Sequence, residues 1–344
     1  MSAGTGDAAM SMAGPADLTV GIDIGGTSVR ASVVDARGTM LDTLRAPTPS
    51  TTAALEHCLD RLVTELRDRW SVAAVGLAIA GFLSPDCSTV RFAPHLPWLE
   101  AAVPGEMSAR LGIPVFAEHD ANSAAVAELH FGAAARGNNT LVLALGTGIG
   151  AGMLQDGRLY RGSFGVAPEF GHITVVPDGR PCDCGKRGCW ERYCSGTALV
   201  DTAVELLASA DLGHSVLAAE TNADPGSLTG RRVAAAAADG DPVATAAFAD
   251  LARWLGQGLA MIADILDPDL IVLAGGLGAA SGLYLDEARE HYAAMVTGAG
   301  HRQLARLRAT QLGESAGVIG AAQVARDGVA GRREAGTVGG PRAQ

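Results

Sequence analysis

The sequence is poor in lysine, in aromatic residues and in long apolar runs, and each shortage excludes something. Among 26 basic residues the only lysine is Lys186. No Gly-Lys-Ser/Thr step therefore exists, which excludes a Walker A loop. No uninterrupted apolar run reaches about 18 residues, so no transmembrane helix is expected. Aromatic residues make up only 4% of the chain, so the core must be built from Ala, Val, Leu and Ile.

Basic charge is also in deficit, because the net charge is −11 at pH 7. This balance argues against general binding to nucleic acid or to an anionic membrane. Residues 1–17 lack a basic region and a continuous apolar stretch, so they do not resemble a secretion signal, and we expect a cytoplasmic protein. Small and polar residues predict disordered tails over 1–17 and 327–344.

Apolar periodicity predicts two rounds of one α/β pattern in a chain of 344 residues, 48% of them hydrophobic. The first round has strands at 18–24, 29–34, 40–45, 72–79 and 115–118, with helices at 51–70 and 121–131. The second begins near Asn139 with strand, Gly-Thr-Gly turn, strand, Asp-Gly turn and strand. A strand follows at 270–274, with helices at 198–209, 231–238, 242–266 and 316–326. The repetition favours a duplicated α/β protein, with a small domain over 18–120 and a larger one over 121–326.

Three glycine-rich turns follow predicted strands. The segment Asp23–Thr27 places an acid in an apolar strand, where burial is costly without a partner, and two glycines then let backbone N–H groups approach an anion. The segment Gly146–Gly148 repeats this turn in the second round, and Gly275-Gly276 ends a strand before a helix. Such a set fits a Mg²⁺–phosphate site, although each turn taken singly also fits an ordinary tight turn.

His119 and Asp120 lie where a predicted strand meets a predicted helix. An Asp at this point is often only a helix cap. Its alternative role is that of a general base, which takes a proton from an attacking hydroxyl group. Phosphoryl transfer requires little more than positioning, charge neutralisation and such a base.

The most specific local pattern is a group of closely spaced cysteines with an upstream histidine. His172 precedes Cys182, Cys184 and Cys189, and this set offers three thiolates and one imidazole to a structural zinc ion. Cys194 competes as the fourth ligand on spacing alone. Reduced, buried thiols without a metal are the alternative interpretation. Two carboxylates, Glu169 and Glu191, flank the set, and a zinc knuckle over 172–191 would hold both toward a polyol.

These motifs together resemble the ROK family of repressors and sugar kinases, and within it the bacterial glucokinases. The segments DIGGTSVR, EHDANSAA, LGTGIGAG, PEFGHI, CDCGKRGCWE and LAGGLG occur in the family's order between about Leu18 and Ala325. The resemblance implies duplicated ribonuclease H-like domains of the hexokinase and actin-like ATPase type, with sugar and ATP in a central cleft. It also implies glucose 6-phosphate formation from glucose and ATP by in-line transfer, with Asp120 as the general base.

The resemblance further assigns the remaining site residues. Those implied for the sugar are Gly81, His119, Asp120, Glu169, His172 and Glu191. Those implied for ATP and Mg²⁺ are Asp23, Gly25, Gly26, Thr27, Gly146, Thr147, Gly148, Gly275 and Gly276. Those implied for zinc are His172, Cys182, Cys184 and Cys189.

Two positions depart from the usual family pattern, and both concern the sugar. Many members have Asn where this chain has His119 and His95. The sugar could therefore be N-acetylglucosamine, N-acetylmannosamine or fructose instead of glucose. A sugar-sensing repressor is a further alternative, but repressors of this family carry an added N-terminal DNA-binding domain. The cysteine knuckle favours ATP over polyphosphate as donor, and the resemblance suggests a homodimer or homotetramer.

Overall fold

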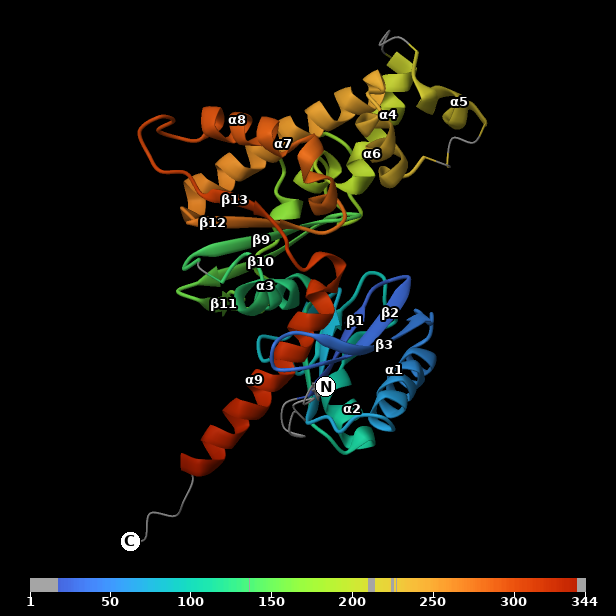
Figure 1. The fold of residues 1–344 in the computed structure, drawn as a ribbon, viewed down its shortest axis with the longest axis vertical. Coiled ribbons are helices and arrows are strands. Elements are labelled where there is room, and N and C mark those ends of the chain that lie inside the picture. Colours follow the sequence, from blue (N-terminus) through green and yellow to red (C-terminus); the bar gives the residue numbers. More distant parts are fainter. Residues whose placement is uncertain (1–17, 136, 210–213, 224–225, 227, 339–344) are drawn as a thin grey trace, which may run out of the picture.

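The computed structural model describes residues 18–135, 137–209, 214–223, 226 and 228–338 (Figure 1). The tail predicted for residues 1–17 and the last residues, 339–344, lie outside these ranges. Two sheets lie one above the other in Figure 1, each with helices packed against it, and the helix α9 runs beside the lower sheet. The architecture is α/β, as the sequence predicts.

The first sheet has five strands in the order β3-β2-β1-β4-β8. Its strands are β1 (Thr19–Ile24), β2 (Ser28–Val34), β3 (Met40–Pro47), β4 (Ala74–Ile79) and β8 (Val115–His119). The first three form an antiparallel meander, whereas β1, β4 and β8 are parallel. Helix α1 (Thr52–Arg67) buries its apolar stripe, including Leu55, Leu59 and Leu62, as the helix-period pattern predicts.

The second sheet repeats this topology in the order β11-β10-β9-β12-β13. Its strands are β9 (Thr140–Leu145), β10 (Ile149–Gln155), β11 (Arg158–Tyr160), β12 (Leu270–Ala274) and β13 (Arg306–Ala309). Again three antiparallel strands come first, followed by two strands parallel to the first of them. The matching order confirms the duplication that the two glycine-rich hairpins predict.

Most helices lie where the periodicity predicts them. Helix α3 (Asp120–Phe131) follows β8 directly, and residues of α4 (Gly196–Ser209), α6 (Gly230–Ala238) and α7 (Pro242–Leu266) share one apolar core with the second sheet. Several elements are not predicted by the sequence pattern: the short strands β5 (Phe82–Leu83), β6 (Val90–Phe92) and β7 (Leu99–Ala101), the edge strand β13 of the second sheet, and the helices α2 (Val103–Leu111), α5 (Val216–Ala223) and α8 (Leu285–Met295). The three short strands form a small sheet of their own.

The C-terminal helix differs from its prediction in length and in packing. Helix α9 spans Ala316–Val338, so residues 327–338, expected in a disordered tail, continue the helix. Tertiary contacts explain the difference, because the Arg332 guanidinium lies 4.7 Å from the centroid of the Phe116 ring on β8. Although its sequence follows the second sheet, α9 packs on β1 and β4 of the first. Gly21 and Gly76 allow this close approach, because a Cβ at either would lie 1.9 Å or less from a carbonyl oxygen of α9.

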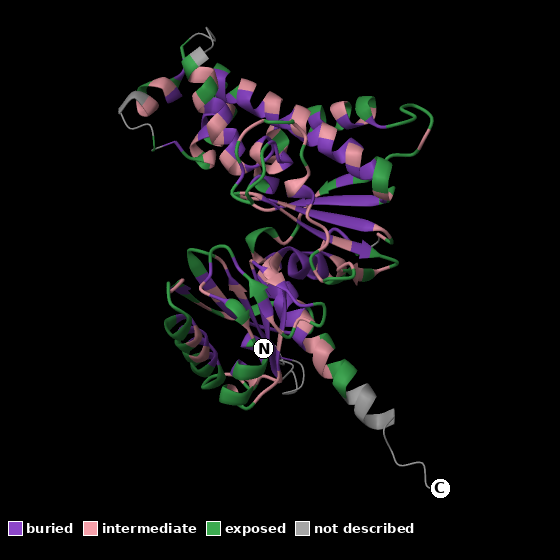
Figure 2. Cartoon of the chain, turned by 180° about the vertical axis from the view of Figure 1, so that it is seen from behind, coloured by how far each residue is buried: buried purple, intermediate pink, exposed green. Residues whose placement is uncertain are grey.

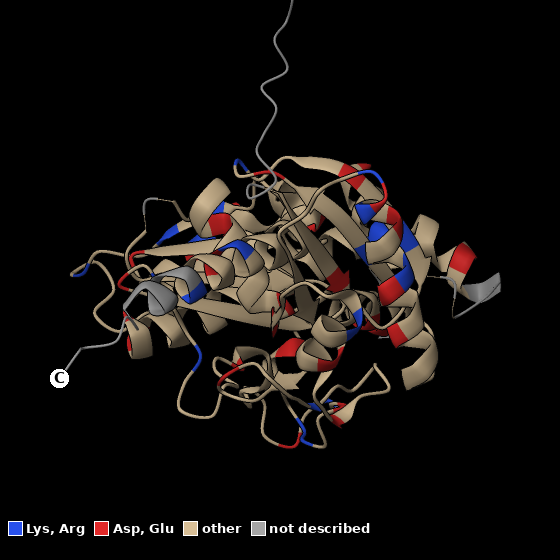
Figure 3. Cartoon of the chain, turned by 90° about the horizontal axis from the view of Figure 1, so that it is seen from below, with Lys and Arg blue, Asp and Glu red and all other residues tan. Residues whose placement is uncertain are grey.

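The buried residues form a separate core around each sheet (Figure 2). Aliphatic side chains dominate both cores, as the scarcity of aromatic residues predicts. In Figure 3, acidic and basic positions are interspersed along the ribbon of the described residues. Within the described ranges, no helix is both long and apolar enough to cross a membrane.

Candidate active site

Asp120 lies where β8 of the first sheet passes into α3. Its Oδ1 atom accepts a hydrogen bond of 2.7 Å from the backbone N–H of Ala121, and Nε2 of His119 lies 3.2 Å from the same oxygen. The Asp120 side chain is 42% exposed, so its second oxygen remains accessible to a ligand. Asp120 is the first residue of α3 and not its N-cap, which is His119 and makes no side-chain capping hydrogen bond. The helix-cap interpretation of Asp120 is therefore wrong, and its carboxylate is an accessible group at the start of the helix.

The predicted sugar-binding groups gather around Asp120. Glu169 immediately precedes the short helix η1 (Phe170–His172). Nε2 of His172 lies 3.9 Å from Oε2 of Glu169. Burial raises the pKa of Glu169. The nearby His119 and His172 oppose this rise, and the carboxylates of Asp120 and Glu191 add to it. Five sequence-predicted site residues are therefore close enough to interact electrostatically. Such a cluster, with a shifted carboxyl group, is typical of a functional site.

A small cavity extends this cluster and adds residues that the sequence analysis does not single out. It is lined by the predicted Gly81, His119 and Glu169. Phe82, Asn122 and the loop Gly165–Pro168 also line it. Asn122 belongs to the quoted EHDANSAA segment and lies two residues after Asp120 in α3. No local pattern marks Gly165–Pro168 as a binding loop. Its position depends on tertiary contacts, which bring Gly165 against Leu83 and Pro85.

Asp23 lies near the end of β1 and faces the N-terminus of α9. A Cβ on Gly317, in the first turn of α9, would lie 3.2 Å from the Asp23 carboxyl carbon. Burial, with a smaller contribution from the Asp120 carboxylate, raises the pKa of Asp23 to about 6, and Arg30 opposes the rise. Arg30 is the cross-strand neighbour of Asp23 on β2. Asp23 is thus within electrostatic reach of Asp120, as a metal-binding acid near a catalytic base would be.

The first glycine turn is closed by backbone hydrogen bonds. The N–H of Gly25 donates to the carbonyl of Ser28 at 3.1 Å, and the Thr48 hydroxyl donates to the carbonyl of Gly25 at 2.6 Å. Gly26 and Thr27 are exposed at its tip. A Cβ on Gly26 would lie 2.8 Å from Cβ of His95, so the turn packs closely against His95.

The second and third glycine turns lie together at one end of the second sheet. The N–H of Leu277 donates to the carbonyl of Leu145 at 3.0 Å, which places the Gly275-Gly276 turn beside the residue that precedes Gly146. Gly275 has φ +81°, and a Cβ there would lie 2.6 Å from the Leu145 oxygen, so glycine is required. The hydroxyl of Thr197 donates to the carbonyl of Thr147, which ties the second turn to α4.

His172, Cys182, Cys184 and Cys189 form one cluster, and their ligand atoms all lie within 4.8 Å of one another. Sγ of Cys182 lies 3.7 Å from Nδ1 of His172, and the Cys184 and Cys189 sulfurs are 3.6 Å apart. A zinc tetrahedron with metal–sulfur distances near 2.3 Å has edges of about 3.8 Å, so the four residues fit zinc. Cys194, the competing ligand, lies instead in the apolar core around the second sheet and is fully buried.

Comparisons with known proteins cover nearly the whole described chain. A model of the ROK family matches residues 19–328. A glucokinase from Streptomyces coelicolor (strain ATCC BAA-471 / A3(2) / M145) is 42% identical over 310 residues, which cover 90% of this chain and 98% of the relative. A crystal structure of a ROK family glucokinase from Streptomyces griseus, in complex with glucose and AMPPNP, is 40% identical and has a TM-score of 0.81, covering 90% of this chain and 99% of its own. A ROK hexokinase structure from Thermus thermophilus is 32% identical and has a TM-score of 0.73, covering 91% and 99%.

Proposed function

The chain belongs to the ROK family, and we propose that it is an ATP-dependent glucokinase, which converts glucose and ATP into glucose 6-phosphate and ADP. The observation that carries this proposal is the position of Asp120. Its accessible carboxylate lies beside His119 and within electrostatic reach of Glu169, which His172 and Glu191 also approach, in a chain similar along nearly its whole length to glucokinases. This arrangement suits activation of a sugar hydroxyl beside a set of hydroxyl-binding groups.

In the proposed mechanism Asp120 is the general base. The sugar 6-hydroxyl donates a hydrogen bond to the free carboxylate oxygen, and its proton passes to Asp120 as the hydroxyl oxygen attacks the γ-phosphorus of ATP. The bond to the β,γ-bridging oxygen breaks in line, and ADP leaves without a phosphoenzyme. The hydrogen bond from Ala121 N–H holds the other carboxylate oxygen, so the side chain is oriented before the sugar binds.

The glycine turns and Asp23 are proposed to bind the nucleotide. Gly25, Gly26 and Thr27 would offer backbone N–H groups to the phosphates from the first sheet, and Gly146–Gly148 from the second. Asp23 would hold Mg²⁺, which neutralises phosphate charge when bound. The turn Gly275-Gly276, which lies against the Gly146 turn, is assigned to the adenosine side of the site.

The cysteine knuckle is proposed to hold a structural zinc ion through His172, Cys182, Cys184 and Cys189. Zinc supplies no reaction step here; when bound, it cross-links the segments that carry two sugar-binding carboxylates. Glu169 lies three residues before His172, and Glu191 two residues after Cys189. With Gly81 and His119, these groups would accept or donate hydrogen bonds to the remaining sugar hydroxyls.

A second candidate substrate is another hexose, and the observation that favours it is the side chain of His119. This residue lines the cavity beside Glu169, at a position where many family members have Asn. A neutral imidazole offers one donor and one acceptor and has a different reach from an amide. N-acetylglucosamine, N-acetylmannosamine and fructose are therefore the alternatives for the same reaction.

The test is a coupled assay of ADP release with Mg-ATP against a panel of hexoses, with a control lacking sugar. Glucose is expected to give the highest kcat/KM, and polyphosphate in place of ATP is expected to give little turnover. Preference for an N-acetylated hexose or for fructose would contradict the substrate but not the reaction. Absence of sugar-dependent turnover from a folded, zinc-loaded protein would contradict the kinase assignment.

Location and assembly are part of the same proposal. ATP is an intracellular donor, and the six cysteines, all within the described residues, form no disulfide in the structure, which supports action in the cytoplasm. The family resemblance supports a homodimer or homotetramer. Light scattering coupled to size-exclusion chromatography would measure the assembly directly.

A further inference from the structure

Glu118 is a buried carboxylate next to the proposed catalytic pair, and it has no part in the mechanism above. It is 1% exposed and forms the penultimate residue of β8. Its Oε1 atom accepts hydrogen bonds from the backbone N–H of His119 at 3.0 Å and from Nδ2 of Asn122 at 2.9 Å. These two donors lie on either side of Asp120 in the sequence. The Glu118 carboxylate therefore fastens the backbone that carries Asp120 both before and after it.

The other oxygen of Glu118 is held by Arg161 from the second sheet. Oε2 accepts from Nε of Arg161 at 2.8 Å and from Nη2 at 2.5 Å. Arg161 directly follows β11, so this ion pair joins the last strand of the first sheet to the meander of the second. Because the carboxylate is almost fully buried, the guanidinium partner is required to compensate its charge.

Arg161 also begins the loop that lines the proposed sugar cavity. Its carbonyl oxygen accepts a hydrogen bond of 3.1 Å from the N–H of Ala167, which closes residues 161–167 into a compact turn. The same loop contributes Gly165–Pro168 to the cavity and leads into Glu169. The side chain of Arg161 thus ties the sugar loop of the second sheet to the strand of the first that carries the base.

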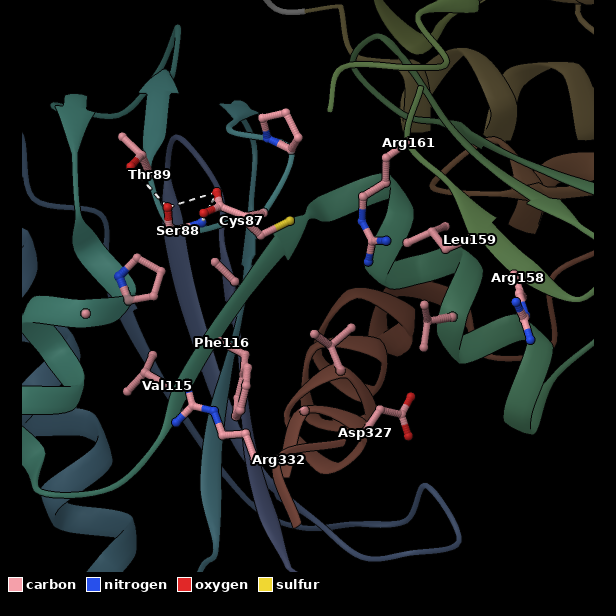
Figure 4. A pocket seen from close by; sticks show the side chains of 18 of the residues that line it. Cys87, Ser88, Thr89, Val115, Phe116, Arg158, Leu159, Arg161, Asp327 and Arg332 are labelled. Carbon is pink, nitrogen blue, oxygen red and sulfur yellow. Dashed lines mark hydrogen bonds between the residues drawn. The ribbon is translucent and has the colours of Figure 1, made fainter. Parts of the chain in front are cut away.

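The pair borders open space and is not embedded in packed core. A cavity of about 970 Å³ lies beside it, lined by Arg161 and Cys87 together with residues of β8, β11 and α9 (Figure 4). The Cys87 sulfur lies 4.0 Å from Oε2 of Glu118. The Arg161 side chain is 36% exposed, whereas that of Glu118 is 2% exposed. Adjacent packing therefore restrains the guanidinium only in part, and its two hydrogen bonds to Glu118 add to that restraint.

We propose that Arg161, through its ion pair with Glu118, is a positioning residue for sugar phosphorylation. It keeps the loop over residues 161–169 in a fixed position relative to the base Asp120. This inference rests on the proposed function. Arg161 connects two parts of the site. Its side chain binds Glu118, which holds the backbone around Asp120, and its own residue begins the loop that carries Gly165–Glu169. Loss of the pair would let these groups shift relative to each other while leaving the glycine turns intact. Misplacement of reacting groups by about 1 Å is enough to slow catalysis about a hundredfold.

The test compares steady-state kinetics of Arg161→Met with those of the unmodified chain. The expected result is a rise of about tenfold or more in KM for glucose and a fall of about tenfold or more in kcat, with KM for Mg-ATP within about twofold. Arg161→Lys, which keeps the charge but not the two-nitrogen contact, is expected to recover part of both losses. Glu118→Gln is expected to resemble Arg161→Met, and the double variant to be no worse than either single one.

Arg158→Met is the matched control, because Arg158 lies three residues earlier on β11, is exposed and lines the same cavity. It is expected to keep the kinetic constants of the unmodified chain. Zinc content and thermal midpoint are measured for every variant. Normal kinetic constants for Arg161→Met would overturn the positioning role, as would equal rises in KM for glucose and for Mg-ATP. It would also be overturned if activity fell only in proportion to the fraction of unfolded protein and Arg161→Lys recovered none of it.

Two controls keep the result decisive. If Arg161→Met does not fold, Arg161→Lys carries the prediction instead, with KM for glucose raised at least about threefold at unchanged KM for Mg-ATP; an unaltered value would overturn it. The unmodified chain is assayed in parallel. Absence of glucose-dependent ADP release from that chain contradicts the proposed function, whereas normal turnover by the variants contradicts only the role of Arg161.

Discussion

The carboxylate of Glu191 accepts a hydrogen bond of 2.9 Å from the backbone N–H of Ile149. Ile149 is the first residue of β10, directly after the Gly146–Gly148 turn, and Glu191 lies two residues after Cys189, at the end of the knuckle. One hydrogen bond thus joins the segment proposed to bind zinc and sugar to the turn proposed to bind phosphate. Gly148 makes this contact sterically feasible, because a Cβ there would lie 2.0 Å from Oε2 of Glu191.

Gly148→Ala is therefore expected to displace the Glu191 carboxylate while leaving the fold intact, since the obstructing atom is at the end of a side chain. KM for glucose should rise about five- to thirtyfold, because a misplaced buried hydrogen bond is worth about 1–2 kcal/mol. Gly146→Ala is the matched comparison, because a Cβ there meets nothing within 4 Å. Both variants can alter KM for ATP, but only Gly148→Ala should alter KM for glucose. Equal glucose affinity in the two would contradict the role of Glu191.

Asp120→Asn tests the general base. The amide oxygen can still accept the hydrogen bond from Ala121 N–H, so the thermal midpoint and zinc content should be unchanged. The amide cannot take up the sugar proton, and kcat should fall by about 10²- to 10⁴-fold. Glucose-dependent ADP release and equilibrium glucose binding are measured together. Near-normal turnover would remove Asp120 from the mechanism, whatever its affinity for the sugar.

Cys184→Ser tests the proposed zinc ligands. Replacing one thiolate of the cluster should lower bound zinc below one equivalent and weaken glucose binding, because Glu169 and Glu191 flank the knuckle. Cys194→Ala is the matched control, since Cys194 lies in the apolar core and outside the cluster. Metal content is measured by mass spectrometry of the purified proteins. One zinc per chain in Cys184→Ser, or zinc loss in Cys194→Ala, would show the ligand set to be wrong.

Local patterns account for the parts of this molecule that the sequence predicts. Apolar runs bounded by glycine predict β12 at its observed limits, and the spacing of the cysteines predicts a cluster that the chain forms within 18 residues of His172. The duplication follows from two similar hairpins. In each case the physical cause, strand burial or ligand spacing, acts between residues close in sequence.

Contacts between distant segments account for what sequence analysis misses. The short strand Phe82–Leu83 has too few residues to show alternation, and it pairs with β6 only after the chain turns back. The C-terminal helix packs on the first sheet, where the absence of side chains at Gly21 and Gly76 leaves room for its backbone. Nothing in its own sequence, which contains several glycines, indicates that destination. No sequence pattern predicts the pairing of Glu118 with Arg161 either, because 43 residues separate them.

Asp23 predicts a specific pH dependence of stability. Burial, together with the Asp120 carboxylate, raises the pKa of Asp23 from 3.8 to about 6. A raised carboxyl pKa means that folding favours the protonated acid. The group therefore leaves stability unaffected below about pH 4, and it lowers stability progressively as the pH rises to about 6, above which the full penalty applies.

Asp23→Asn removes this penalty and should be more stable than the unmodified chain by about 3 kcal/mol at pH 8, with a difference roughly half as large at pH 5. Urea denaturation at the two pH values measures both numbers. The same variant should lose Mg-ATP binding, because the amide is a poor Mg²⁺ ligand. A pH-independent difference in stability would contradict the raised pKa.

The extension of α9 makes a prediction about two glycines on one helix. A Cβ on Gly328 would lie 2.4 Å from the Phe116 ring, whereas one on Gly331 would meet nothing within 4 Å. Gly328→Ala should therefore lower the free energy of unfolding by about 1–2 kcal/mol, because the close contact with Phe116 outweighs the gain in helix propensity. Gly331→Ala keeps only that gain and should raise it by up to about 1 kcal/mol. Thermal and urea denaturation of both variants give the comparison. Equal, small effects at the two positions would mean that this part of the helix does not pack on β8 in solution, because only the contact with Phe116 distinguishes them.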